Sequence, residues 1–394
     1  MKEGVIQMNE KFKKLFEEVR LPNGAVLKNR FAMSPMVVNG SSYEGNIGND
    51  DIKYFERRSD VGGLIISGAS SVTPDGNAFG YGLGIYDDSQ IDGWKKMAEV
   101  MKSKGNKALV QIFHPGYQAA YTYRDKGVVY GPSDMDASFL EYPVTGMTKD
   151  QIEEAINQFV QAARRAIEAG FDGVEIHGAN HYFIQQFFSK KSNSRTDEFG
   201  GSIENRARLA LEIVKSVKEY VKKHAKLDFI IGYRLSPEEI HEENPGYLLE
   251  DSLYLINEVV KLGVDYIHTS LWGSRGYANE ASLGEYKGQA INKVIKSLLD
   301  NRAILIGAGD MTSPEKILEA TEYVDVAAMA SLAIIDPDAK NKIYEGRENE
   351  VTLVVTKENL DSLALPEKFP VMTRAMVRSG SVPDETIKVL KKEI

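Results

Sequence analysis

The sequence of 394 residues predicts an α/β fold: a single (β/α)8 TIM barrel followed by a carboxyl-terminal helical extension. A helical pattern that ends in glycine is repeatedly followed by an apolar run, as at Gly105, Gly170 and Gly263. Glycine just past a helix adopts the left-handed conformation at little cost, and an uninterrupted apolar strand is typical of a parallel sheet buried on both faces. The first strand is not followed by a glycine-rich dinucleotide-binding turn, which favours a closed barrel over an open doubly wound sheet.

Buried apolar runs predict eight strands. In chain order they are Arg30 to Met36, Leu64 to Ser67, Ala108 to Phe113, Gly173 to His177, Phe229 to Arg234, Tyr266 to Thr269, Ile304 to Gly307 and Val326 to Ala330. The clearest helical patterns between them are Asp150 to Ala169, Ile203 to His224, Asp251 to Leu262 and Pro314 to Ala320. Thr148 and Gln151 predict a capping box at the first of these helices. We therefore expect a (β/α)8 barrel domain over residues 1–337 and an extension packed on it over 338–394.

Composition excludes several classes of function. The chain has no cysteine, which excludes disulfides, thiolate nucleophiles and cysteine-held clusters. The net charge of −9, without a long cluster of Lys and Arg, argues against a nucleic-acid partner. No apolar run approaches the roughly 20 residues of a membrane helix, and Met1 to Leu21 contain no apolar signal segment. These features predict a cytoplasmic protein without a membrane partner. We separately expect a small-molecule substrate, and a homo-oligomer stays open.

Polar residues follow the carboxyl ends of several predicted strands, where barrel enzymes build their active sites. They are Gln111, His114, His177, Asn180, Arg234, His268 and Thr269. Any one of them alone could merely satisfy backbone groups, but their convergence at one end of the barrel favours an active site. The connection from His114 to Thr148 follows the third strand, so we expect it to form a lid or a substrate wall.

The densest polar group lies after the fourth strand. His177 and Asn180 offer two hydrogen-bond donors suited to polarising a carbonyl oxygen, and Tyr182 is near enough to supply a proton. His177 and His181 are four residues apart, as in zinc-binding helices, so a metal-dependent hydrolase or aldolase is an alternative. Because no glutamate follows the first histidine and Gly178 indicates a strand-to-loop turn, we expect no metal ligands here and place His181 on the loop surface.

Two segments carry a family resemblance. Gly170 to His177 with Asn180 and Tyr182, and then Ser194 to Arg206, resemble the signature of the Old Yellow Enzyme family. Shorter matches extend the similarity over roughly Phe12 to Pro337. The resemblance implies a barrel that binds FMN, accepts hydride from NADH or NADPH, and reduces activated alkenes such as α,β-unsaturated carbonyls, or similar electrophiles.

The resemblance also implies the roles of individual residues. His177 and Asn180 would bind the substrate oxygen, and Tyr182 would protonate the carbon beside the carbonyl. The residues implied for the flavin ring are Pro35, Met36, Ala69, Gln111 and Arg234. Those implied for the flavin phosphate are Gly309, Asp310, Ala330 and Ser331.

The phosphate positions depart from the family pattern. Members commonly carry Gly-Gly after the seventh strand and Gly-Arg after the eighth, where this chain has Gly309-Asp310 and Ala330-Ser331. A carboxylate would repel the phosphate and the arginine is missing, so we expect weaker FMN binding unless Asp310 turns away or another cation compensates. A barrel that has lost tight flavin binding and serves as a sensor or scaffold is therefore a third interpretation.

Overall fold

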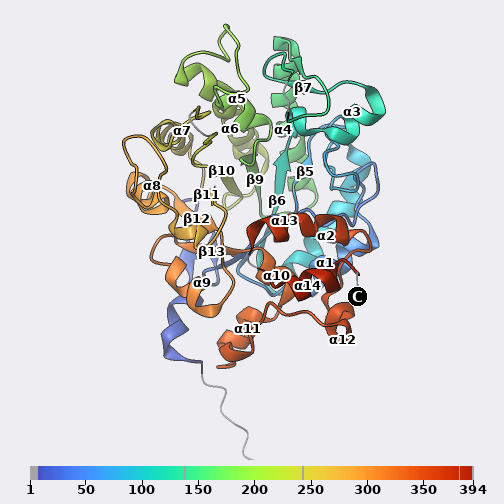
Figure 1. Ribbon diagram of the computed structural model, residues 1–394, viewed down its shortest axis with the longest axis vertical. Coiled ribbons are helices and arrows are strands. Elements are labelled where there is room, and N and C mark those ends of the chain that lie inside the picture. Colours follow the sequence, from blue (N-terminus) through green and yellow to red (C-terminus); the bar gives the residue numbers. More distant parts are fainter. Residues whose placement is uncertain (1–7, 137–138, 242–243, 381, 393–394) are drawn as a thin grey trace, which may run out of the picture.

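Eight parallel strands close into a barrel in the computed structural model, which describes residues 8–136, 139–241, 244–380 and 382–392 (Figure 1). The barrel strands are β3 (Phe31–Met33), β4 (Leu64–Ile66), β6 (Lys107–Phe113), β9 (Gly173–Gly178), β10 (Ile230–Leu235), β11 (Tyr266–Ser270), β12 (Ile304–Ala308) and β13 (Val326–Met329). Leu64 on β4 pairs with Ala32 on one side and with Lys107 on the other, which closes the sheet. The eight predicted strands and the predicted fold class are confirmed, while residues 1–7 of the predicted barrel domain lie outside the described residues.

The first strand is shorter than predicted. β3 ends at Met33 because Pro35 has no N–H with which to continue the ladder. The Ser34 amide still donates to the Met329 carbonyl at 2.8 Å. The chain therefore leaves β3 directly above the barrel, where Pro35 is buried and Met36 is partly exposed.

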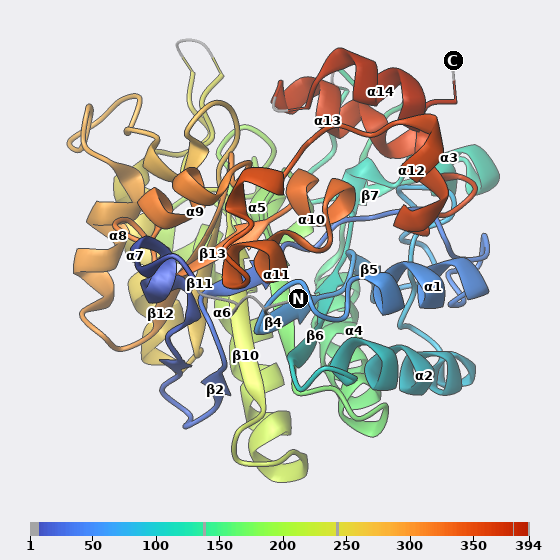
Figure 2. The same ribbon diagram turned by 90° about the horizontal axis from the view of Figure 1, so that it is seen from below.

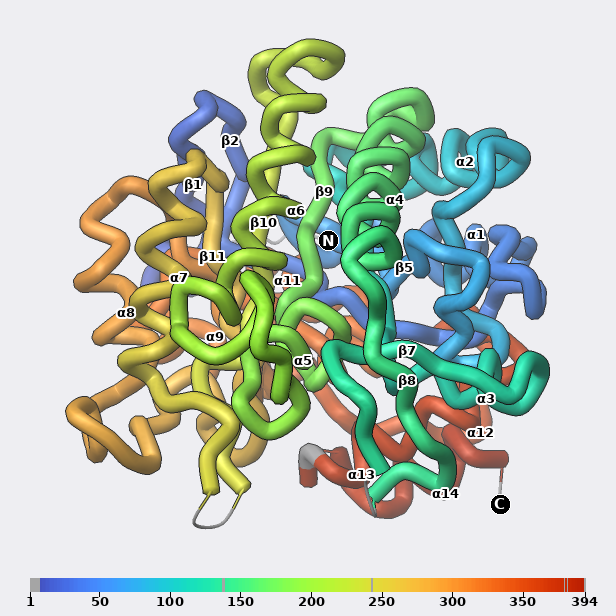
Figure 3. The backbone as a smooth tube through the Cα atoms, turned by 90° about the horizontal axis from the view of Figure 1, so that it is seen from above, coloured from blue at the N-terminus to red at the C-terminus, as the bar shows by residue number. Residues whose placement is uncertain are grey.

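Helices surround the strands (Figure 3). They are α1 (Asn49–Arg57), α2 (Ile91–Lys102), α4 (Lys149–Glu168), α6 (Ile203–His224), α7 (Leu249–Lys261), α8 (Ile291–Leu299), α9 (Pro314–Ala320) and α10 (Ser331–Ile335). The four predicted helices are confirmed to within two residues at each end. Thr148 and Gln151 form the predicted capping box, with the Gln151 amide 3.2 Å from Thr148 Oγ1 and the Thr148 amide 2.9 Å from Gln151 Oε1.

The amino-terminal end of the barrel is closed by a hairpin that sequence patterns did not predict. It consists of β1 (Val19–Arg20) and β2 (Val26–Leu27), and its apolar side chains join the lower barrel interior in one buried cluster. Figure 2 labels the second strand of the hairpin, β2, in the dark blue segment. Higher in the barrel, Gly232 faces Tyr266, whose ring occupies the space that a side chain at position 232 would need. The lower interior of the barrel is thus filled with apolar side chains, and polar side chains line the interior above them.

The connection between β6 and α4 forms a separate layer at the carboxyl-terminal end of the barrel. It contains α3 (Ala120–Lys126) and the parallel pair β7 (Tyr130–Gly131) and β8 (Thr145–Gly146). Tyr117, Ala119, Val129 and Val144 form its own apolar cluster. The remaining short elements near the site are β5 (Ser70–Ser71), which extends the sheet beside β6, and α5 (Phe183–Phe188). In the described residues no helix combines the length and apolar character needed to cross a bilayer.

One buried arginine, the residue that follows α1, bonds both to α10 and to the carboxyl-terminal extension. The extension contains α11 (Ala339–Tyr344), α12 (Lys357–Leu360), α13 (Thr373–Ser379) and α14 (Asp384–Leu390), and α12 to α14 lie beside the start of the barrel (Figure 1). The fully buried Arg58 guanidinium donates to the carbonyls of Tyr54, Ala333, Ile334 and Leu363 at 2.8–3.1 Å. Burial lowers the pKa of Arg58 to about 10, so the guanidinium remains charged at neutral pH. The boundary at residue 337 stays a prediction.

We predict that Arg58→Ala destabilises the protein by about 3 kcal/mol or more, because four buried carbonyls lose their donor. The neighbouring Arg57 also contacts the extension, through Asp338 at 2.9 Å, but this pair is partly exposed. Arg57→Ala should therefore cost only about 1 kcal/mol or less. Urea denaturation of both variants measures the difference, and equal losses would show that Arg58 is not the anchor.

Candidate active site

A buried ionised carboxylate lies in the upper part of the barrel. Glu175 on β9 accepts hydrogen bonds from Gln111 Nε2 at 2.7 Å, the Tyr266 hydroxyl at 2.9 Å and His268 Nδ1 at 2.8 Å. Burial alone would raise the pKa of Glu175, but His268, the charge of Arg234 and the Tyr266 hydroxyl together lower it to about 2. The carboxylate is therefore charged at any physiological pH and needs these partners.

Arg234 is the cation beside this carboxylate. It lies on β10, opposite His177 on β9 and His268 on β11. Its Nη2 donates to Ser270 Oγ at 3.2 Å, whereas its buried Nε has no hydrogen-bond partner among the described residues. Burial lowers the pKa of Arg234, and Glu175 opposes this shift. An unpaired guanidinium N–H in the interior is costly, so the geometry indicates that an acceptor binds here. This fits the electron-rich pyrimidine side of a flavin.

The orientation of the Asn180 amide follows from a chain of hydrogen bonds. Arg234 can only donate, so Ser270 Oγ accepts from it and gives its own hydrogen to Asn180 Oδ1 at 2.8 Å. The amide NH2 of Asn180 is thereby left as a donor. Asn180 itself has a positive φ of 58°, which holds the turn after β9 in the left-handed conformation.

The tautomer of His177 is fixed in a similar way. Its Nδ1 accepts from the Ala179 amide at 3.2 Å, so the ring proton is on Nε2. Burial, followed by the charge of Arg234, lowers the pKa of His177 to about 3. His177 is therefore a neutral Nε2–H donor.

Tyr182 stands next to His177 at the start of α5. Its ring centroid lies 5.2 Å from that of His177 and 5.2 Å from that of Phe113, both in edge-to-face contacts. Burial raises the pKa of the Tyr182 hydroxyl, and Arg234 offsets this only in part. The hydroxyl thus keeps its proton at neutral pH, while the partly exposed side chain remains reachable from solvent.

Gln111 has one free hydrogen-bonding group. Its NH2 donates to Glu175, so its amide oxygen remains to accept a hydrogen bond, as the imide N–H of a flavin would require. Pro35 and Ala69 are buried at the same end of the barrel, and Met36 approaches Gly68 so closely that a side chain at position 68 would meet the Met36 carbonyl. Pro35, Met36, Ala69 and Gln111, which the resemblance implies for the flavin ring, therefore lie at the ends of neighbouring strands. This arrangement fits a bound flavin.

At the positions implied for the flavin phosphate, the negative charge of Asp310 is paired with a nearby lysine. Lys316 Nζ lies 2.9 Å from Asp310, whose carboxylate also accepts from the Arg275 amide at 2.7 Å and from Thr312 Oγ1 at 3.1 Å. The Asp310 side chain is only 5% exposed, so its charge is neutralised by Lys316 rather than free to repel an anion. Of the departures from the family pattern, the missing arginine remains: Ala330 and Ser331 lie partly exposed between β13 and α10.

Some candidates from the sequence do not join this group. His114 accepts from the Gly116 amide at 2.9 Å, packs on Phe183, and has its pKa lowered to about 4 by burial. Thr269 points outward and donates to Asn292 at 2.8 Å. His181 Nδ1 lies 3.5 Å from Glu239, in a cluster of possible metal ligands that does not include His177. These three residues therefore do not face the barrel interior with the others.

Sequence reasoning missed Glu175, Tyr266 and Ser270. A signal was present for the first of these: Glu175 and His177 are two residues apart on a buried strand, so both face the same side. A charged residue at that position in an otherwise apolar strand indicates a buried polar network. No comparable signal distinguishes Ser270.

Known proteins are similar to this chain over most of its length. A model of the NADH:flavin oxidoreductase / NADH oxidase family matches residues 14–350. The probable NADH-dependent flavin oxidoreductase YqiG of Bacillus subtilis is 37% identical over 377 residues, 95% of this chain and 99% of the relative. The NADH:acrylate oxidoreductase of Vibrio harveyi is 38% identical over 333 residues, which are 83% of this chain but only 33% of that longer protein.

A solved structure of morphinone reductase in complex with tetrahydroNAD superposes with a TM-score of 0.72 at 24% identity, over 90% of this chain and 96% of that one. At this identity the superposition shows the fold. The chain is thus an NAD(P)H-dependent flavin oxidoreductase with FMN as its cofactor. It belongs to the NADH:flavin oxidoreductase / NADH oxidase family, the Old Yellow Enzyme family that its motifs resemble.

Proposed function

We propose that the enzyme reduces activated alkenes, such as α,β-unsaturated carbonyl compounds, with Tyr182 as the proton donor. The observation that carries this proposal is a pair of neutral donors, His177 Nε2–H and the Asn180 amide, held beside a protonated tyrosine. When bound, FMN supplies a hydride acquired from the reduced nicotinamide. Arg234 and Gln111 would hold its pyrimidine side.

The two donors bind the oxygen of the substrate. A carbonyl oxygen gains negative charge when hydride adds to the β-carbon, and two fixed N–H groups stabilise this charge more strongly than they stabilise the ground state. Because His177 is neutral, it can donate without forming an ion pair that would trap the product. His177 and Asn180 therefore select substrates with an electron-withdrawing oxygen.

Tyr182 completes the reduction by protonating the carbon next to the carbonyl. A tyrosine whose pKa is raised is a weak acid, but the enolate-like carbon is a far stronger base, so transfer is downhill. The partly exposed side chain can then recover a proton from solvent. The name of the acrylate oxidoreductase relative, which acts on a short activated alkene, supports this class of substrate.

Two other interpretations gain less support. A sensor or scaffold was motivated by a repulsive Asp310 and by Ser331 in place of an arginine; Lys316 neutralises the charge of Asp310, whereas Ser331 remains a departure. Among the described residues, the group of possible metal ligands that contains His181 does not contain His177, as a metal-dependent hydrolase using both histidines would require. The choice between NADH and NADPH is left open, and the cytoplasmic location and homo-oligomer stay predictions.

Tyr182→Phe is expected to separate the two half-reactions. Reduction of the bound FMN by nicotinamide should survive, because it needs no proton from Tyr182, whereas oxidation by an α,β-unsaturated ketone should slow by ~10²-fold or more. Anaerobic stopped-flow absorbance measures each half separately. If both slow by the same factor, Tyr182 has a structural role, and if neither slows, another acid supplies the proton.

Ser270→Ala is expected to weaken oxygen binding without removing a group that touches the substrate. Without Ser270 the Asn180 amide loses the partner that fixes its orientation, so we expect phenolate ligands, which mimic the substrate oxygen, to bind about 10-fold more weakly. His177→Ala serves as the positive control, since it removes a donor directly. Titrations followed by the charge-transfer band give both affinities, and unchanged binding in Ser270→Ala would refute the hydrogen-bond chain.

A further inference from the structure

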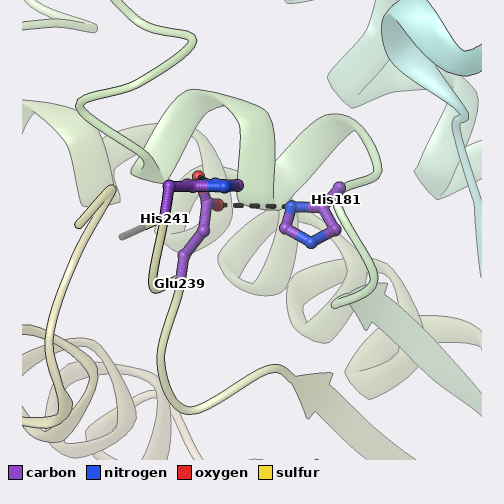
Figure 4. Close-up of side chains that lie close together, drawn as sticks. All are labelled: His181, Glu239 and His241. Atoms are coloured by element: carbon purple, nitrogen blue, oxygen red, sulfur yellow. Dashed lines mark hydrogen bonds and ion pairs between the residues drawn. The ribbon is translucent and has the colours of Figure 1, made fainter. Parts of the chain in front are cut away.

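A second cluster of chemically active side chains lies outside the barrel interior. It consists of His181 in the turn after β9 and of Glu239 and His241 in the loop after β10. Figure 4 shows the imidazole rings of His181 and His241 close to the Glu239 carboxylate. The alkene reduction proposed above uses none of these three side chains.

We propose that His181, Glu239 and His241 form a binding site for a divalent zinc-class cation. Their ligand atoms all lie within 4.8 Å of one another. Glu239 Oε2 is 3.5 Å from His181 Nδ1, and Glu239 Oε1 is 3.0 Å from His241 Nε2. Ligands of a tetrahedral zinc ion at bond lengths near 2.1 Å are separated by about 3.4 Å, so the observed spacing needs only small side-chain rotations.

The types of donor favour zinc over harder cations. Two imidazole nitrogens and one carboxylate oxygen match the three-ligand set that leaves a fourth position for water. Magnesium and calcium prefer sites made of oxygen alone, and two histidines make this set unsuitable for them. The absence of cysteine does not weaken the case, because a His2Glu set contains no sulfur.

The carboxylate is held in place by groups behind it. Ser189 Oγ donates to Glu239 Oε1 at 2.6 Å, and Gln185 Nε2 donates to Oε2 at 2.8 Å. A side chain at Gly246 would collide with both Glu239 and Ser189, so glycine leaves the carboxylate its space. Such outer hydrogen bonds orient ligands and strengthen metal sites.

The exposure of the cluster also suits a cation. The Glu239 side chain is 5% exposed, whereas those of His181 and His241 are 50% and 40% exposed. A cation can thus enter from solvent and keep a water ligand on the open side.

The position of His181 links this site to the catalytic turn. His181 lies between Asn180 and Tyr182 and has a positive φ of 61°, an uncommon conformation for a residue with a side chain. Gln118 and Gln186 donate to its carbonyl, each at 2.7 Å. A cation that joins His181 to the loop after β10 would therefore brace the turn that presents Asn180 and Tyr182.

Zinc binding to the full-length protein tests the proposal directly. The protein, stripped of metals with a chelator, is titrated with zinc chloride in competition with a chromophoric chelator. We expect one Zn²⁺ per chain with a dissociation constant of about 1 μM or tighter, and no competition from millimolar magnesium. His181→Ala and His241→Ala should each weaken binding at least ~100-fold, because each removes a ligand.

His224 provides the matched control, since it is an exposed histidine at the end of α6, before β10, whereas the cluster lies after β9 and β10 at the other end of these strands. His224→Ala should change zinc affinity less than about 2-fold. Both cluster variants alter partly exposed side chains, so circular dichroism can verify that they remain folded. Binding weaker than about 0.1 mM in the unaltered protein, or equal affinity in the unaltered protein and both cluster variants, overturns the proposal.

Discussion

The buried carboxylate of Glu175 is the constraint on which the active site depends. It accepts hydrogen bonds from side chains on β6 and β11 and opposes the charge of Arg234 on β10, so it joins four adjacent strands. A charge in the barrel interior is tolerated only when its partners are complete. By taking the NH2 of Gln111, it leaves that residue's amide oxygen as the group that can meet the cofactor.

The same constraint extends through Arg234 to Asn180, the proposed donor to the substrate. Arg234 donates to Ser270, Ser270 donates to Asn180, and the Asn180 amide is thereby oriented as a donor. The turn that carries Asn180 and His181 has two successive left-handed residues, which costs conformational energy. Such strain persists at an active site when the surrounding network fixes it, and here the network extends from the barrel interior to the loop.

Much of the fold could be predicted because its signals are local. Apolar strands, glycine after helices and the Thr148 capping box depend only on neighbouring residues, and all were confirmed. The anchoring of the extension by Arg58 could not be predicted, since it joins carbonyls about 275 to 305 positions away in the chain. The short hairpin β1–β2 also gave no signal in the sequence, because strands of two residues are too short to show a hydrophobic periodicity.

The candidate site was only partly predictable for the same reason. Residues at strand ends could be assigned to the active-site end of the barrel, but their hydrogen-bond partners depend on packing between strands. Lys316 is six residues from Asp310, and nothing in the sequence indicates that a turn and the first part of α9 bring the two charges together. Ser270 and Glu239 likewise acquire their roles only through contacts with distant loops.

On the proposed placement of the cofactor, the Glu175 charge balances Arg234 and so sets the electrostatics at the flavin. The direct measurement is the midpoint potential of bound FMN in Glu175→Gln, which keeps the shape but removes the charge, with Tyr266→Phe as a control that removes one hydrogen bond and keeps the charge. Uncompensated Arg234 should favour the reduced, more negative cofactor, raising the potential by about 30 mV or more, with a smaller change in the control. An unchanged or lower potential in Glu175→Gln, with FMN still bound, would contradict the account.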